Sequence, residues 1–278
     1  GALKNHDRAL IVGQKTFGKG SVQVLYNLPD GSALKLTIAQ YLTPGEVSIQ
    51  GIGVTPDIVI DPMTVDKDDM DLAVDKTHLR ESDLRSHLSY QGAVDKQDAA
   101  LMMRYYLPVD VRNRLRSALP EDREENEKEA LFLTRFSTRL LKDARMKLGR
   151  EALLASAKKL VPKVGVEEMR KAAQELRKLG VDWQDAPATA TGGSPKFEVT
   201  AKTSAQSGSV VAGEPLDVIV TVKNIGTAPA YRLRAETESE FDLFDERELV
   251  FGKLEPGASK SWRAPLGACG RATDSRRK

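Results

Sequence analysis

The sequence predicts a mixed α and β protein with several domains, because its character changes three times along its 278 residues. Residues 1–62 consist of short apolar runs separated by turn residues, which is typical of strands. Residues 63–185 are rich in charge and carry apolar residues at helical spacing. From residue 196 onward the apolar residues alternate again, as in strands. The chain is long enough to bury more than one core.

Composition excludes several function classes. The net charge is only +2 with 29% charged residues, so we expect no nucleic-acid partner. No apolar run is long enough to span a bilayer, and residues 1–4 lack the features of a signal peptide. The chain also lacks an initiator methionine, and we interpret it as a fragment of a longer protein.

Metal and thiol chemistry are not expected either. Cys269 is the only cysteine, so no internal disulfide can form, and a single thiol near a tail is typical of an incidental residue. His6, His78 and His87 show no metal-ligand spacing with acidic or cysteine neighbours. We therefore expect no metal and no cofactor.

The first segment predicts a buried strand followed by a hairpin. Residues 9–12 form a continuous apolar run closed by Gly13, as expected of a strand buried on both faces. Apolar residues then alternate along residues 22–26 and 34–38, with a Pro-Asp-Gly-Ser turn between them.

Residues 13–20 come close to a phosphate-binding loop, but the pattern fails in two places. Gly20 stands where the loop needs a hydroxyl for magnesium. A strand, and not a helix, is expected after Lys19, although the helix N-terminus is what holds the phosphate. We therefore reject nucleotide binding and look for another role for Lys19.

Several short motifs occur in one order along this segment. They are FGKG at 17–20, LPDGSALKLT at 28–37, TP at 43–44, IQG at 49–51 and GVTPD at 53–57. Together they resemble the C-terminal part of the catalytic domain of the C-terminal processing peptidases, also called tail-specific proteases. The resemblance implies part of an α/β core of the crotonase or ClpP-like type, and it covers about a fifth of the chain.

That resemblance implies a serine peptidase with a Ser-Lys dyad, acting on protein or peptide substrates in an extracytoplasmic bacterial compartment such as the periplasm or cell envelope. By position, Lys19 is the general base and Gln23 its partner four residues later. A lysine base must lose its proton, which an exposed lysine keeps to about pH 10.4. We therefore expect Lys19 to be buried among apolar groups, with Phe17 contributing. Gln23 can orient the amine without adding charge. Lys15 is the other lysine that could be the base, but it lies outside the glycine pair and we favour Lys19.

The family's nucleophile is expected upstream of residue 1, so residues 1–278 alone are predicted to be inactive. Ser21 and Ser32 are interpreted as strand and turn residues. A second hypothesis is a noncatalytic extracytoplasmic scaffold or adhesion protein that binds through its C-terminal part. Retention of both Lys19 and Gln23 favours the peptidase.

The rest of the chain divides by composition. Two helices with one apolar stripe each are predicted within residues 63–185, at Leu133, Phe136, Leu140, Ala144 and Leu148, and at Val166, Met169, Ala173, Leu176 and Leu179. Gly180 is the predicted C-cap of the second helix. Such helices either pack on their neighbours, which we favour, or form a regulatory or dimerising arm. Residues 186–195 read as a linker, residues 196–266 resemble an immunoglobulin-like β-sandwich, and residues 267–278 read as a frayed tail.

Overall fold

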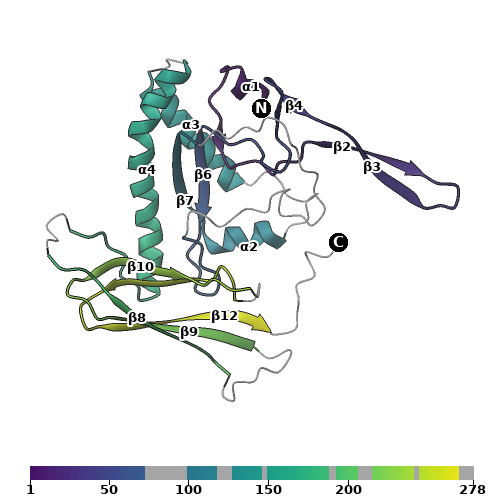
Figure 1. The fold of residues 1–278 in the computed structure, drawn as a ribbon. Coiled ribbons are helices and arrows are strands. Elements are labelled where there is room, and N and C mark those ends of the chain that lie inside the picture. The colour runs from purple at the N-terminus through teal and green to yellow at the C-terminus, as the bar shows by residue number, and fades with distance from the viewer. Residues whose placement is uncertain are drawn as a thin grey trace. The chain divides into compact units, whose positions relative to one another are not determined.

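A computed structural model describes residues 1–72, 99–117, 127–145, 149–187, 192–205, 215–240 and 244–268. They form helices and strands together, so the mixed α and β prediction is confirmed (Figure 1). The chain divides into two compact units. The first unit comprises Gly1–Pro62, Thr77–Tyr105 and Arg114–Glu168, and the second comprises Met63–Lys76, Tyr106–Asn113 and Met169–Lys278.

A small sheet lies in the first unit, with the strand order β1-β6-β7. Strand β1 (Val12–Gly13) is parallel to β6 (Ile58–Met63), and β7 (Leu101–Tyr106) lies on the other side of β6. Ile58 and Ile60 are almost fully buried, as expected of the central strand of a sheet. The short helix α1 (Ala2–Asn5) precedes this sheet.

The strand predicted at residues 9–12 is wrong in extent and in burial. The strand occupies only Val12–Gly13, and Ile11 before it is half-buried. The reason lies in Asp57, because its carboxylate accepts a 2.8 Å hydrogen bond from the backbone N–H of Ile11. A side chain thus takes a donor that a neighbouring strand would otherwise use.

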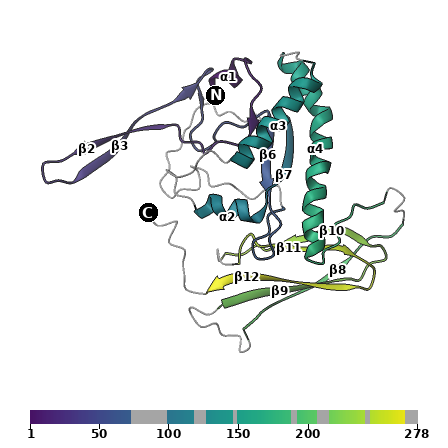
Figure 2. The ribbon, with the colours of Figure 1, turned by 180° about the vertical axis from the view of Figure 1, so that it is seen from behind.

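The predicted hairpin is confirmed. Strands β2 (Ser21–Asn27) and β3 (Ala33–Gln40) pair antiparallel along their whole length and form an extended hairpin (Figures 1 and 2). At its tip, the N–H of Leu28 donates to the carbonyl of Ser32 at 2.8 Å. Strands β4 (Leu42–Thr43) and β5 (Val47–Ser48) then form a second, shorter hairpin.

Helices follow the first strands in the chain: α2 (Val109–Ser117), α3 (Glu127–Asp143) and α4 (Arg150–Lys178). The apolar stripe predicted for α3 is confirmed where it can be described, because Phe136, Leu140 and Ala144 are buried and Leu133 is half-buried. Leu148 lies outside the described residues. Phe132 of α3 also stacks on Tyr105 of β7, with ring centroids 4.4 Å apart.

The stripe predicted for α4 is confirmed only in part. Met169 packs against the buried core and Ala173 is half-buried. Val166 is 61% exposed and Leu179 is 38% exposed, although Leu176 is buried. The helix begins at Arg150 and continues through Pro162, and its buried positions begin well before the predicted stripe. The buried apolar residues are Leu153, Ala157, Leu160, Val161 and Val164 in the first unit, and Ala172 and Leu176 in the second.

The end of α4 agrees with the prediction for Gly180. This glycine has φ +79°, and the N–H of Val181 donates to the carbonyl of Leu176 at 2.9 Å. A left-handed residue that lets the chain close a bond back onto the last turn is a usual C-cap, and glycine adopts it without steric cost.

Two antiparallel sheets make up most of the second unit. Strands β8 (Phe197–Thr203), β9 (Pro215–Asn224) and β12 (Ser259–Ala268) form one sheet in the order β12-β9-β8. Strands β10 (Ala230–Glu236) and β11 (Glu248–Leu254) form the other. The alternating valines of β9 are buried as predicted, together with apolar residues of β11 and β12.

Candidate active site

Lys19 lies in the turn that leads directly into β2, between Gly18 and Gly20. Gly18 has φ +94°, a conformation that residues with a Cβ rarely adopt. The chain continues from this turn as a strand, as predicted. The turn therefore lacks the helix N-terminus that a phosphate-binding loop requires.

The two predicted catalytic residues have different hydrogen-bond partners. Lys19 Nζ donates to Ser21 Oγ at 3.3 Å, and Gln23 Nε2 donates to Thr37 Oγ1 at 3.3 Å. Ser21 and Gln23 are two residues apart on β2, and the pairing with β3 shifts register between Val22 and Gln23. Both Lys19 and Gln23 are exposed.

That exposure differs from the buried setting expected for a lysine base. The described residues leave Lys19 open to solvent, and Phe17 beside it is 40% exposed. Ser21 is the first residue of β2, which agrees with its interpretation as a strand residue. The desolvation required of Lys19 would have to come from protein outside the described residues.

The hairpin that follows Lys19 has one apolar face. Tyr26 pairs with Leu34 and Val24 pairs with Leu36, which places all four side chains on one side of the hairpin. Tyr26, Leu34 and Leu36 are 48%, 47% and 43% exposed. Neighbouring large apolar residues with this much exposure usually mark a surface that contacts other protein.

A second loop holds the turn of Lys19 and was given no role in the sequence analysis. Gln50, only 4% exposed, accepts a 2.7 Å hydrogen bond on Oε1 from the N–H of Gly20. The N–H of Gly51 donates to the carbonyl of Gly18 at 2.9 Å. The signal in the sequence was an amide side chain among glycines and apolar residues, where an unpaired polar group would be costly.

A buried carboxylate near the start of β6 was also missed. Asp57 is 3% exposed and accepts from the N–H of Ile11 and from Nη2 of Arg150, the latter at 2.6 Å. Arg150 Nε lies 3.5 Å from a carboxylate oxygen of Asp7. The hydrogen bond to Asp57 raises the pKa of the Arg150 guanidinium. Nothing in the local sequence reveals a pair that is 93 positions apart.

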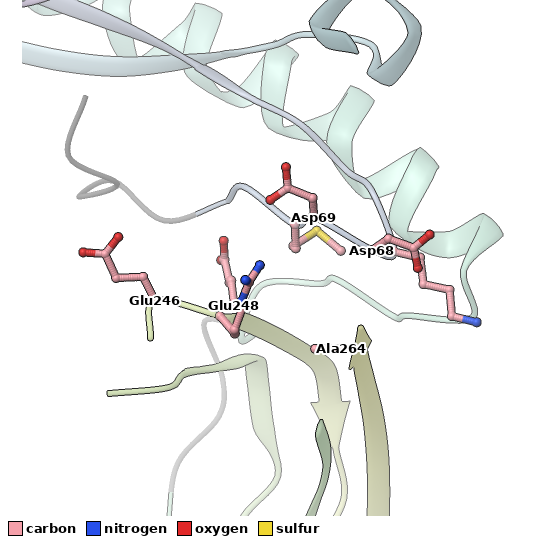
Figure 3. Close-up of a pocket in the computed structure, with 8 residues that line it drawn as sticks. Asp68, Asp69, Glu246, Glu248 and Ala264 are labelled. Carbon is pink, nitrogen blue, oxygen red and sulfur yellow. The ribbon is translucent and has the colours of Figure 1, made fainter. Parts of the chain in front are cut away.

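A small cavity lies in the second unit, with Asp68 and Asp69 on one side and Glu246 and Glu248 on the other (Figure 3). Lys67 and Arg247 also line it. Its volume is about 20 Å³, room for about one water molecule. Glu248 accepts a 2.6 Å hydrogen bond from the N–H of Leu72. The described residues contain no group of three or more His, Cys, Asp or Glu placed to hold a metal ion.

The remaining residues considered in the sequence analysis are the three histidines and the cysteine. His6 is exposed after α1, while His78, His87 and Cys269 lie outside the described residues. None of the helices in the described ranges has the length and apolar character needed to cross a membrane.

Comparison with known proteins identifies the first segment. Residues 1–60 match the sequence model of Peptidase family S41. A carboxy-terminal-processing protease of Bartonella bacilliformis is 48% identical over 96 residues, which are 34% of this chain and 21% of that protein. The resemblance to the C-terminal processing peptidases is thus confirmed.

Relatives from chloroplasts match the same part. A chloroplastic C-terminal processing peptidase of Tetradesmus obliquus is 48% identical over 68 residues, covering 24% of this chain and 15% of that protein. The chloroplastic carboxyl-terminal-processing peptidase 2 of Arabidopsis thaliana is 51% identical over 57 residues, covering 20% and 11%. The chain therefore spans about a fifth or less of the length of these relatives.

Proposed function

We propose that the protein is a serine endopeptidase of the C-terminal processing type and that residues 1–60 carry the lysine of its Ser-Lys dyad. The observation that carries this proposal is the match of residues 1–60 to Peptidase family S41, with relatives named for processing of carboxyl termini. The substrates are proteins or peptides. Because several of the relatives are bacterial, we further propose, from the resemblance to this family, an extracytoplasmic bacterial location for this protein.

Within the dyad, Lys19 is the general base and Gln23 orients it. Hydrogen bonds with Gly51 and Gln50 hold the backbone on both sides of Lys19, and a base at a fixed distance from its nucleophile needs such a fixed backbone. The serine and the apolar surroundings of Lys19 are assigned to peptidase sequence beyond these residues, because the relatives are several times longer than the matched part. The apolar hairpin face described above supports this assignment, since other protein would cover it.

Outside the peptidase segment, we retain the domain division proposed from the sequence. Residues 63–185 are a helical extension, residues 186–195 a linker, and residues 196–266 an immunoglobulin-like module. The two antiparallel sheets with buried apolar residues support the last of these proposals. A module of this type serves to dock or space domains, and its fold does not identify a ligand.

The test uses the full-length gene product and unfolded β-casein as a probe substrate, with products read by mass spectrometry. Lys19→Met should lower kcat/KM by about a thousandfold or more, because a general base contributes about 10²–10⁴. Lys15→Met is the matched control, since it removes a lysine four residues away in the same loop, and it should leave turnover near that of the wild type. Normal cleavage by the Lys19 variant would remove this lysine from the dyad.

A further inference from the structure

The turn that carries Lys19 and the loop at residues 50–54 are joined backbone to backbone. The N–H of Thr16 donates to the carbonyl of Val54 at 3.2 Å, and the N–H of Val54 donates to Thr16 Oγ1 at 2.7 Å. The contact tolerates no side chain between the two loops. A Cβ on Gly53 would lie 2.0 Å from the carbonyl oxygen of Thr16, and a Cβ on Gly18 would lie 2.8 Å from the nitrogen of Gly53.

Hydrogen bonds hold the backbone on both sides of Lys19. Before it, the carbonyl of Gly18 accepts from the N–H of Gly51 at 2.9 Å. After it, the N–H of Gly20 donates to Gln50 Oε1 at 2.7 Å. Gln50 and Gly51 are consecutive, so a single short stretch of the second loop fixes both neighbours of the lysine.

The bond to Gly20 has a direct geometric effect on Lys19. The peptide unit is planar and runs from the Cα of Lys19 to the Cα of Gly20. A hydrogen bond that holds the N–H of Gly20 therefore fixes the orientation of this peptide plane. Because Lys19 Cα lies in the plane, the bond also fixes the direction in which the Lys19 side chain leaves the backbone. Gly20 has no side chain of its own to restrain that rotation.

Burial makes Gln50 suitable for this task. The residue is 4% exposed, so its bond to Gly20 is shielded from competing water. Its backbone N–H donates to Ser48 Oγ at 3.1 Å, which ties the residue to the end of β5. An amide can accept the bond without bringing a negative charge near Lys19, whereas a carboxylate would favour the ammonium form.

We propose that Gln50 is a positioning residue of the peptidase, which aims Lys19 through the backbone of Gly20 without touching the substrate. This proposal rests on the proposed function of Lys19 as general base. The expected consequence is kinetic: loss of the bond displaces the amine and lowers kcat, while substrate binding is largely unaffected.

The experiment uses the full-length protein, β-casein-derived peptide as the substrate, and a fluorophosphonate probe to count reactive serines. Gln50→Met removes the acceptor at nearly the same side-chain length and should lower kcat per titrated site by about 10-fold to 100-fold, with KM changed less than about twofold. Gln174→Met, on the exposed side of α4, is the control and should match the wild type.

Gln50→Glu provides a readout that a purely structural role would not move. Its carboxylate still accepts from Gly20, so kcat at high pH should recover toward the wild-type value. Its charge favours protonated Lys19, so the acid limb of the pH profile of kcat/KM should move to higher pH. If the fluorophosphonate probe labels no serine in Gln50→Met, the pH profile of Gln50→Glu decides the question alone. An acid limb of kcat/KM at the wild-type pH then overturns the proposal.

The outcomes separate this proposal from the one on which it rests. Wild-type kcat per titrated site in Gln50→Met, alongside an inactive Lys19→Met, overturns the role of Gln50 and leaves Lys19 as the base. Full turnover by Lys19→Met, or no peptidase activity in the wild type, overturns both. Reduced kcat in Gln50→Met with the shifted profile in Gln50→Glu supports both.

Discussion

Arg150, the first residue of α4, donates a 2.6 Å hydrogen bond to the buried carboxylate of Asp57, just before β6. Asp57 belongs to the segment that matches the peptidase family, and Arg150 lies outside it. The ion pair therefore joins the matched segment to a helix that lies outside the match. Asp57 is 3% exposed, so the ion pair lies largely away from solvent at its acidic end.

Removing the arginine should destabilise the first unit. Arg150→Met leaves the Asp57 carboxylate buried with only the Ile11 N–H as a hydrogen-bond donor among the contacts described above, and should cost about 2–3 kcal/mol of unfolding free energy. Arg139→Met is the matched control, because its ion pair with Glu167 is exposed at both ends and should contribute less than about 1 kcal/mol. Urea unfolding followed by circular dichroism measures both, and equal effects would contradict the assignment.

A buried asparagine should be equally important in the second unit. Asn224 is fully buried, and its Nδ2 donates to the carbonyls of Ala228 and Leu254 at 2.8 and 3.1 Å. Asn224→Ala leaves those carbonyls without this donor and should cost about 2–4 kcal/mol. Asn113→Ala, at an exposed position of α2, is the control. Tryptophan fluorescence during urea unfolding is the measurement, and a loss below about 1 kcal/mol would count against this role.

Two glycine substitutions should have opposite effects on stability, because only one of the two glycines lies at the contact between the loops. Gly53→Ala adds a Cβ 2.0 Å from the Thr16 carbonyl oxygen at φ +76° and should destabilise the fold by about 2 kcal/mol or more. Gly165→Ala has no atom within 4 Å of its Cβ and lies inside α4, where alanine should stabilise by about 0.5–1 kcal/mol. Thermal melting of both variants tests this, and two melting temperatures shifted in the same direction would refute it.

Acid should affect the tip of the β2 and β3 hairpin. The side chain and the backbone N–H of Ser32 donate to Asp30 and lower the pKa of its carboxyl below the usual 3.8. A lowered pKa means that this local stabilisation is present above pH 3.8 and is lost as the pH falls through the lowered value. Ser32→Ala should raise the pKa of Asp30 toward 3.8 in a carboxyl NMR titration. An unchanged titration would show that the hydroxyl bond does not cause the shift.

The sequence predicted the elements whose signals are local. Alternation along residues 22–26 and 34–38 with a turn between them identified the hairpin, and the glycine after α4 identified its end. The apolar face predicted for α4 holds at Met169, Ala173 and Leu176. It fails at its two ends, where Val166 is exposed and Leu179 lies beyond the last helical residue. Only packing along the whole helix decides which of its faces is buried.

The candidate site was predictable only in part. Lys19 and Gln23 came from a resemblance to a family, and their catalytic roles remain predictions. Gln50 and Asp57 act through partners 30 and 46 residues away along the chain, so no spacing rule could connect them. The burial expected for Lys19 was inferred from the chemistry of a lysine base, and the described residues do not provide it.

The extended hairpin has a practical consequence for producing the protein. Its two strands pair with each other in a two-stranded sheet, so their outer edges can accept strands from other molecules. These edges lie beside the apolar side chains of Tyr26, Leu34 and Leu36. Protein in which nothing covers the hairpin should therefore self-associate as its concentration rises. Light scattering of purified samples thus gives a rapid check: a monodisperse sample indicates that the hairpin is covered in an assembled peptidase domain, and growing particles indicate that it is not.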